Sequence, residues 1–207
     1  SLLVEDVEFK NLGFVVTDEQ HRFGVRQREN IIAKGKNPDV LVMTATPIPR
    51  TLALILYGDL DISIIDELPP NRKKIETYAV TYRLEDRVNN FIRKNLAEGR
   101  QAYVVCPLVE ENEELNMKSV TKICEKYKNE IFKDYRVELL HGKMKQKEKD
   151  EIMQEFKDGK INILVSTTVI EVGVNVPNAN IMVVENSEHF GLAQLHQLRG
   201  RVGRGEY

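Results

Sequence analysis

The segment Gln197–Gly205 near the end of the chain combines three arginines with three glycines. Guanidinium groups carry a positive charge at any physiological pH and bind phosphate oxygens in pairs, and glycine lets the main chain approach a ligand closely. This composition is typical of a polyphosphate site. A surface loop rich in arginine and glycine is more often simply solvated, so the segment does not define a function by itself.

Two adjacent acids, Asp18 and Glu19, follow the apolar run 13–16. In α/β nucleotide hydrolases, a buried strand that ends in two acids holds a magnesium ion and orients a water. Asp18 would then reach Mg²⁺, and Glu19 would orient or deprotonate the attacking water. The alternative is that these acids only begin a loop after the strand.

Two further segments share one layout and favour the hydrolase interpretation. Residues 40–50 and residues 163–177 each begin as an apolar strand and continue into small hydroxyl residues and a proline. Hydroxyl groups at the end of a strand can connect a nucleotide site to a neighbouring ligand, although capping of the next helix is their commoner role.

In chain order, these four segments resemble motifs II, III, V and VI of superfamily 2 helicases. Within and between these motifs, the amino-acid sequence of four segments is similar to that of bacterial ATP-dependent DNA helicases that remodel branched DNA. The segments are residues 18–25, 44–51, 65–70 and 191–197. The resemblance covers essentially the whole chain. Two alternatives stay open: a DNA translocase like the transcription-repair coupling factors, and a non-catalytic interaction module with a helicase fold.

The resemblance implies an α/β fold with two RecA-like (P-loop NTPase) domains, each a parallel sheet flanked by helices. Adjacent prolines at 69–70 cannot continue a helix or a central strand, so we place the domain boundary there. Residues 1–70 are expected to be the C-terminal part of the first domain, with motifs II and III. Residues 71–207 are expected to be a nearly complete second domain, with motifs IV to VI, truncated at its end.

The resemblance also implies that ATP and Mg²⁺ bind between the two domains. Glu19, Arg201 and Arg204 would be catalytic, with Asp18 holding Mg²⁺. Gln197 and Gly173 would contact the nucleotide. Residues that contact DNA or couple it to the nucleotide would be His21, Thr44, Thr46, Arg50, His141, Thr167 and Thr168. Many superfamily 2 members have Asp where this chain has Asn175, which leaves a role in ribose binding open.

The sequence contains no glycine-rich phosphate loop with Lys and Ser/Thr, which this class of hydrolase needs. We therefore expect the chain to be an internal piece of a longer protein and to be inactive as an ATPase alone. The resemblance implies that the intact protein is a monomeric helicase acting on branched or double-stranded DNA in recombination and repair. The open edge of an incomplete first sheet would let the fragment self-associate.

Bulk composition is compatible with these expectations. The 207 residues are 42% hydrophobic with a net charge of -2, so any DNA contact must come from local basic patches. Neither the two cysteines nor the four histidines have the spacing of a metal site, and we expect no zinc. No apolar run approaches the roughly 20 residues that span a bilayer, and we expect a cytoplasmic protein.

Short β-rich runs alternate with amphipathic stretches, which is typical of a parallel sheet covered by helices. Apolar residues 84, 88, 91, 92 and 96 predict a helix that ends at Gly99, and residues 152, 153 and 156 predict another before Gly159. The predicted strands are 14–18, 40–44, 75–80, 102–106, 137–140, 161–165 and 181–184.

Overall fold

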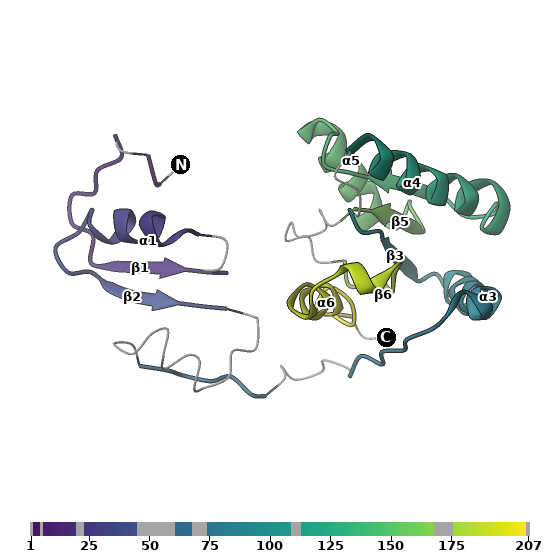
Figure 1. The fold of residues 1–207 in the computed structure, drawn as a ribbon, viewed down its shortest axis with the longest axis horizontal. Coiled ribbons are helices and arrows are strands. Elements are labelled where there is room, and N and C mark those ends of the chain that lie inside the picture. The colour runs from purple at the N-terminus through teal and green to yellow at the C-terminus, as the bar shows by residue number, and fades with distance from the viewer. Residues whose placement is uncertain are drawn as a thin grey trace. The chain divides into compact units, whose positions relative to one another are not determined.

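The computed structural model describes residues 2–4, 6–19, 23–44, 61–67, 74–108, 113–167 and 176–205. Contacts between Cα atoms divide the chain into two units, residues 1–63 and residues 64–207 (Figure 1). The proline pair at 69–70 lies outside the described residues. The domain boundary placed there stays a prediction.

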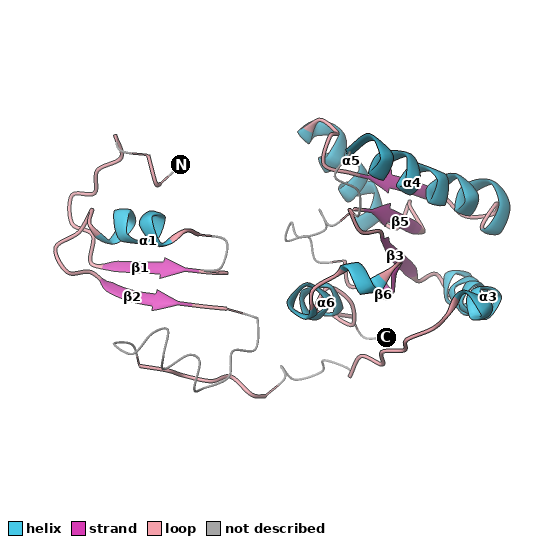
Figure 2. Cartoon of the chain, in the orientation of Figure 1, coloured by secondary structure: helices cyan, strands magenta, loops and turns pink. Residues whose placement is uncertain are grey.

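The first unit contains a two-stranded parallel sheet of β1 (Phe14–Thr17) and β2 (Asp39–Val42), with α1 (Val25–Ile32) between them in sequence (Figure 2). Val16 pairs with Leu41 in the register, and both side chains are exposed. Val15, which points to the opposite face because side chains alternate along a strand, is buried. One face of this sheet is therefore open to solvent.

The second unit is built on a four-stranded sheet in which all neighbouring strands are parallel. The strand order is β4 (Val137–Leu140), β5 (Ile163–Ser166), β3 (Gln101–Val105), β6 (Ala179–Val184). Every residue of β3 and β5 is buried. Continuous burial follows from helices on both faces of a parallel sheet, and it explains why these strands read as unbroken apolar runs rather than alternating ones.

Alternate residues of β3 belong to two separate core layers. Ala102 and Val104 lie in the layer that includes Ile92 of α3 (Glu85–Ala97) and Val120 of α4 (Glu113–Lys126). Tyr103 and Val105 lie in the other layer, with side chains from α5 (Gln146–Lys157) and α6 (Leu192–Arg199). The second unit is thus a three-layer α/β/α arrangement, with α3 and α4 on one face and α5 and α6 on the other.

The helix ends follow the glycines identified in the sequence. Gly99 and Gly159 have φ angles of 81° and 75°, in the left-handed region that glycine adopts without strain, and they follow α3 and α5 directly. A π-helical turn, Tyr127–Ile131, continues α4, and short 3-10 turns occupy Tyr82–Leu84 and Ser187–His189. No helix in the described ranges is long and apolar enough to cross a membrane.

The strand predicted at residues 75–80 is wrong. These residues are described without strand pairing, and Tyr78 and Val80 are exposed. A β-rich composition records only a preference for a pleated, half-buried surface. No strand in the described residues pairs with this segment, so that surface is not formed here. The other six predicted strands are confirmed, with shifts of one or two residues at their ends.

Candidate functional site

The acidic pair lies directly beyond the carboxyl end of β1. The amide of Glu19 donates a hydrogen bond to Oδ1 of Asp18 at 2.8 Å. Glu19 has a φ of 49°, a left-handed conformation that non-glycine residues rarely adopt. The chain therefore turns sharply here, and the two carboxylates are presented from a tight bend rather than from an extended loop.

Thr44 lies at the same edge of the sheet as the acids. The amide of Met43 donates to the carbonyl of Thr17 at 2.8 Å, which continues the pairing of β1 and β2 past their ends. In the parallel register Thr17 lies opposite Val42, so two residues further on Thr44 lies beside Glu19 in the turn after β1. The structure thus brings three of the sequence-predicted residues together; His21, Thr46 and Arg50 lie outside the described residues.

A second group of predicted residues lies at the carboxyl edge of the sheet in the second unit. His141 follows β4 and Thr167 follows β5, and these two strands are neighbours with Leu140 opposite Ser166. Thr167 is buried, with 2% of its surface exposed. His141 and Thr167 are therefore adjacent at this edge, whereas Thr168, Gly173 and Asn175 lie outside the described residues.

His141 is held in its uncharged form by its surroundings. Burial is the main cause that lowers its pKa, and the positive charges of Lys149 and Lys143 act in the same direction. Its Nδ1 atom is buried and has no hydrogen-bond partner among the described residues. Lys149 is fixed nearby, since its Nζ donates to the carbonyl of Gly142 at 2.6 Å. The edge thus combines an imidazole whose pKa is lowered with the ammonium group of Lys149, a set that can bind a phosphate backbone.

The arginine segment is anchored to the core by the apolar residues between its cations. Leu198, in the last turn of α6, and Val202 are both buried in the layer on that face of the sheet. Nε of Arg204 donates to the carbonyl of Gly200 at 2.8 Å. Gly203 has a φ of 68°, which lets the chain turn between Arg201 and Arg204. Apolar anchors thus fix the backbone from which the guanidinium groups project.

Close packing further fixes the end of this segment. A Cβ atom on Gly205 would lie 2.3 Å from the carbonyl oxygen of Pro177. Pro177 precedes β6, so this contact lies at the amino edge of the sheet, the opposite edge from His141 and Thr167. Within the second unit, the end of the arginine segment and the pair His141 and Thr167 therefore lie at opposite edges of the sheet.

The positive charges of Arg201 and Arg204 act on Tyr103, a buried residue of the sheet. Burial raises the pKa of Tyr103, in β3, to about 12, and the positive charges of Arg201 and Arg204 oppose this rise. Gln197 is half-buried in α6, one turn before these arginines. All three predicted nucleotide contacts in this segment therefore belong to one continuous helix-and-turn unit.

Sequence reasoning missed two polar residues at the carboxyl edge of the second sheet. The Oγ atom of Ser166 is buried without a hydrogen-bond partner in the described part of the chain. Glu185 follows β6 and accepts a hydrogen bond from the hydroxyl of Tyr127 at 3.5 Å; burial is the main cause that raises its pKa. An acid directly after an apolar strand is the pattern that identified Asp18, and it was available for Glu185 too.

A magnesium ion is compatible with the acidic turn. Mg²⁺ commonly keeps several waters and takes only one or two carboxylates from a protein, with the remaining ligands from substrate phosphates. The exposed carboxylate of Asp18 could supply one such ligand. No cluster of three or more His, Cys, Asp or Glu side chains suited to a metal is found in the described ranges. The donor set therefore fits a substrate-borne Mg²⁺ rather than a metal held by protein alone.

Comparison with known proteins identifies the class. Residues 84–206 match the family described as the helicase conserved C-terminal domain, more than half of this chain, and the chain belongs to that family. The α/β fold class with RecA-like helicase architecture is confirmed by this match and by the solved structure reported next.

Among known proteins, the chain is similar over nearly its whole length to RecG helicases. The chain is 56% identical over 205 residues to the ATP-dependent DNA helicase RecG of Thermotoga maritima and 54% identical over 207 residues to that of Bacillus subtilis. It is similar to a solved structure of RecG bound to a three-way DNA junction, with 52% identity, a TM-score of 0.72 and 97% of this chain covered. The predicted resemblance to RecG is confirmed.

The chain spans 26% and 30% of the length of those two relatives, and 25% of the RecG chain on the junction. More distant structures, such as yeast Dbp5 bound to RNA and ADP BeF3 at 14% identity and a TM-score of 0.57, share the fold alone.

Proposed function

We propose that this chain is part of an ATP-dependent, double-strand DNA helicase that remodels branched DNA, such as replication forks and Holliday junctions, in recombination and repair. One observation supports this above all: nearly the whole chain follows, at 52% identity, a RecG that was solved on a three-way DNA junction. The activity belongs to the longer protein, of which this chain supplies the segments described above.

In the proposed mechanism, the acidic turn performs the hydrolytic step. Glu19 orients the attacking water and accepts its proton as the general base, and its left-handed backbone fixes the direction in which its side chain leaves the turn. Asp18 would hold Mg²⁺, which would neutralise charge on the phosphate oxygens. The hydrogen bond from the backbone amide of Glu19 fixes the orientation of the Asp18 carboxylate relative to the turn.

The arginine segment would stabilise the charge that develops on the transferred phosphoryl group. Arg201 and Arg204 project from a backbone held by the buried side chains of Leu198 and Val202, and the bond of Arg204 to the carbonyl of Gly200 holds its guanidinium near α6. Gln197 and Gly173 would contact the nucleotide. Such an arginine can contribute several orders of magnitude to the rate.

The remaining predicted residues would contact DNA or couple it to hydrolysis. In the first unit Thr44 lies beside the acidic turn, and we assign the same coupling role to Thr46, Arg50 and His21. In the second unit His141 and Thr167 lie at the carboxyl edge of the sheet, and we assign the same role to Thr168. The neutral imidazole would donate a hydrogen bond to a phosphate oxygen without the desolvation cost of a buried cation.

The decisive experiment compares two substitutions in the intact protein. Glu19→Gln keeps the size of the side chain but removes the basic carboxylate, so DNA-stimulated ATP hydrolysis should fall by at least about 100-fold while ATP binding persists. Glu29→Gln, on the exposed surface of α1, is the matched control and should leave turnover unchanged. Equal turnover in both variants would refute the role of Glu19.

Substrate choice separates the alternatives. A branched-DNA helicase should unwind three-way and four-way junctions in preference to unbranched duplex, whereas a coupling-factor-like translocase should displace a stalled RNA polymerase. A non-catalytic module should show no DNA-stimulated turnover in the intact protein. The chain of 207 residues alone should show none either, because it lacks the phosphate loop; robust turnover abolished by Glu19→Gln would refute that expectation.

A further inference from the structure

The turn that follows β4 is tied to α5 by the side chain of Lys149. Its Nζ donates a hydrogen bond to the carbonyl of Gly142 at 2.6 Å. A longer bond of 3.3 Å, from the amide of Met144 to the carbonyl of His141, closes the turn itself. Lys149 is half-buried, whereas Gly142 and Lys143 are exposed at the tip of the turn. The shorter of these two bonds thus comes from outside the turn.

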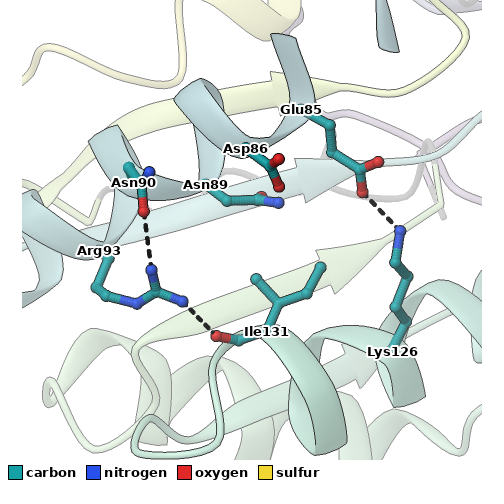
Figure 3. A pocket seen from close by; sticks show the side chains of 7 residues that line it. All are labelled: Glu85, Asp86, Asn89, Asn90, Arg93, Lys126 and Ile131. Carbon is teal, nitrogen blue, oxygen red and sulfur yellow. Dashed lines mark hydrogen bonds and ion pairs between the residues drawn. The ribbon is translucent and has the colours of Figure 1, made fainter. Parts of the chain in front are cut away.

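Lys149 differs in its partner from Lys126, the lysine at the end of α4. Nζ of Lys126 lies 2.6 Å from a carboxylate oxygen of Glu85, so an acid balances its charge (Figure 3). Lys149 makes no ion pair in the part of the chain that the structure describes, and a backbone carbonyl takes the place of the acid. The guanidinium of Arg93 makes a contact of the same kind, with the carbonyl of Ile131 at 2.7 Å (Figure 3). A cation bonded in this way holds the backbone in one orientation.

The carbonyl that Lys149 holds belongs to the residue of the turn with the most conformational freedom. Glycine has no Cβ atom and adopts a wider range of backbone angles than any other residue, so Gly142 needs an external contact to keep one conformation. A peptide bond is planar and trans, so the carbonyl of Gly142 and the amide of Lys143 point in opposite directions. The bond from Lys149 therefore also sets the direction of that amide, away from the ammonium group.

We propose that Lys149 is a positioning residue for DNA, which holds the turn 141–144 in the conformation that binds a phosphate group of the DNA backbone. This inference rests on the proposed function, in which His141 at the start of the turn contacts a phosphate oxygen. Lys149 acts through the carbonyl of Gly142 rather than as a ligand of the phosphate. The placement of the groups supports this division, because the ammonium group is engaged on the carbonyl of a half-buried side chain's neighbour while the tip that it holds is exposed to a ligand.

The test measures binding of the intact protein to a fluorescently labelled three-way DNA junction over a series of salt concentrations. Lys149→Met removes the bond to Gly142 and should weaken binding about three- to tenfold, the range expected for one hydrogen bond. All measurements are made at about pH 8, where an imidazole is uncharged, so that a change in the pKa of His141 does not alter the charge of the turn. Equal affinity of wild type and variant would overturn the proposal.

The salt dependence separates a positioning role from a direct contact. A lysine that neutralises a phosphate contributes about one unit to the slope of log affinity against log salt concentration, because it releases a counterion. A lysine that only holds the backbone contributes little to this slope. Lys149→Met should therefore weaken binding to a similar extent at every salt concentration, with the slope of the wild type retained. A slope reduced by about one unit would show that Lys149 is itself a phosphate ligand, and the proposal would be wrong.

Lys157→Met is the matched control, since Lys157 is exposed in the last turn of α5, about 12 Å further along the helix. It makes the same change of charge and should leave the affinity unchanged. The midpoint of thermal unfolding of Lys149→Met should stay within about 2 °C of the wild type. A larger fall would make Lys149 a residue of general stability and would overturn the positioning role. Failure of the wild type to bind the junction would refute the proposed function itself, and this inference with it.

Discussion

Gln101 is the buried polar residue whose removal should cost the second unit most. It opens β3 and is 1% exposed. Its Nε2 donates to the carbonyl of Phe156 at 2.5 Å and to that of Ile161 at 2.7 Å, and its Oε1 accepts from Asn178 at 3.3 Å. One side chain therefore ties together the end of α5, the approach to β5 and the approach to β6.

Gln101→Leu keeps the approximate volume and deletes all three hydrogen bonds. The carbonyl of Phe156 retains a bond from the amide of Gly159 at 3.1 Å, so the loss there is partial. Each buried hydrogen bond contributes about 1 kcal/mol net, and a buried acceptor left without its donor costs about 1–3 kcal/mol. The free energy of unfolding should therefore fall by roughly 2–4 kcal/mol, partly offset by the added apolar burial.

Urea unfolding of the chain, followed by circular dichroism, measures this loss. The control is Gln154→Leu on the exposed face of α5, where the amide bonds only Asp158 at 2.7 Å. It makes the same chemical change and should alter the free energy of unfolding by less than about 0.5 kcal/mol. If Gln101→Leu also stays within that range, the three hydrogen bonds do not stabilise the amino edge of the sheet and the reasoning is wrong.

Two further substitutions test other contacts. Gly205→Ala would place a Cβ atom 2.3 Å from a backbone carbonyl, so the free energy of unfolding should fall by about 1–3 kcal/mol in urea titrations, whereas Gly191→Ala, where the nearest atom would be 3.8 Å away, should change little. Glu185→Gln concerns pH. The folded pKa of Glu185 is raised above 4.5, so the folded state binds the proton more tightly than the unfolded state and stability is lost as pH rises through the folded pKa. The glutamine variant should therefore resist heat better than the wild type at pH 7, and this gain should vanish below about pH 4.5; a gain independent of pH would contradict the assignment.

Much of the second unit was predictable from sequence because its central strands are short apolar segments that can be recognised by composition alone. Both faces of β3 and β5 are covered, so all of their residues except Gln101 and Ser166 are apolar and the strands can be located from the sequence. Gly99 and Gly159 marked helix ends, since a left-handed residue is needed there. The segment 75–80 failed because its β-rich composition carries no information on whether a neighbouring strand exists.

The candidate site was predictable only in part. Asp18, Thr44, His141 and Thr167 come directly after strands, and the rule that carboxyl ends of parallel strands meet at one edge groups them within each unit. The hydrogen bond between Arg93 and the carbonyl of Ile131 was not predictable. It joins residues 38 positions apart, and a contact of that kind follows from packing rather than from spacing.

The order of strands in the second sheet also determines when this unit can fold during synthesis. β3 is synthesised first, yet its partners β5 and β6 follow about 60 and about 80 residues later. Until residues 179–184 emerge from the ribosome, β3, which is apolar after Gln101, lacks one of its two neighbours. Parallel strands separated by this many residues pair slowly, and until they pair their unpaired edges are exposed and prone to aggregation. Completion of β6 is therefore the event that protects the nascent unit from aggregation, and chains that stop short of it should need a chaperone to stay in solution.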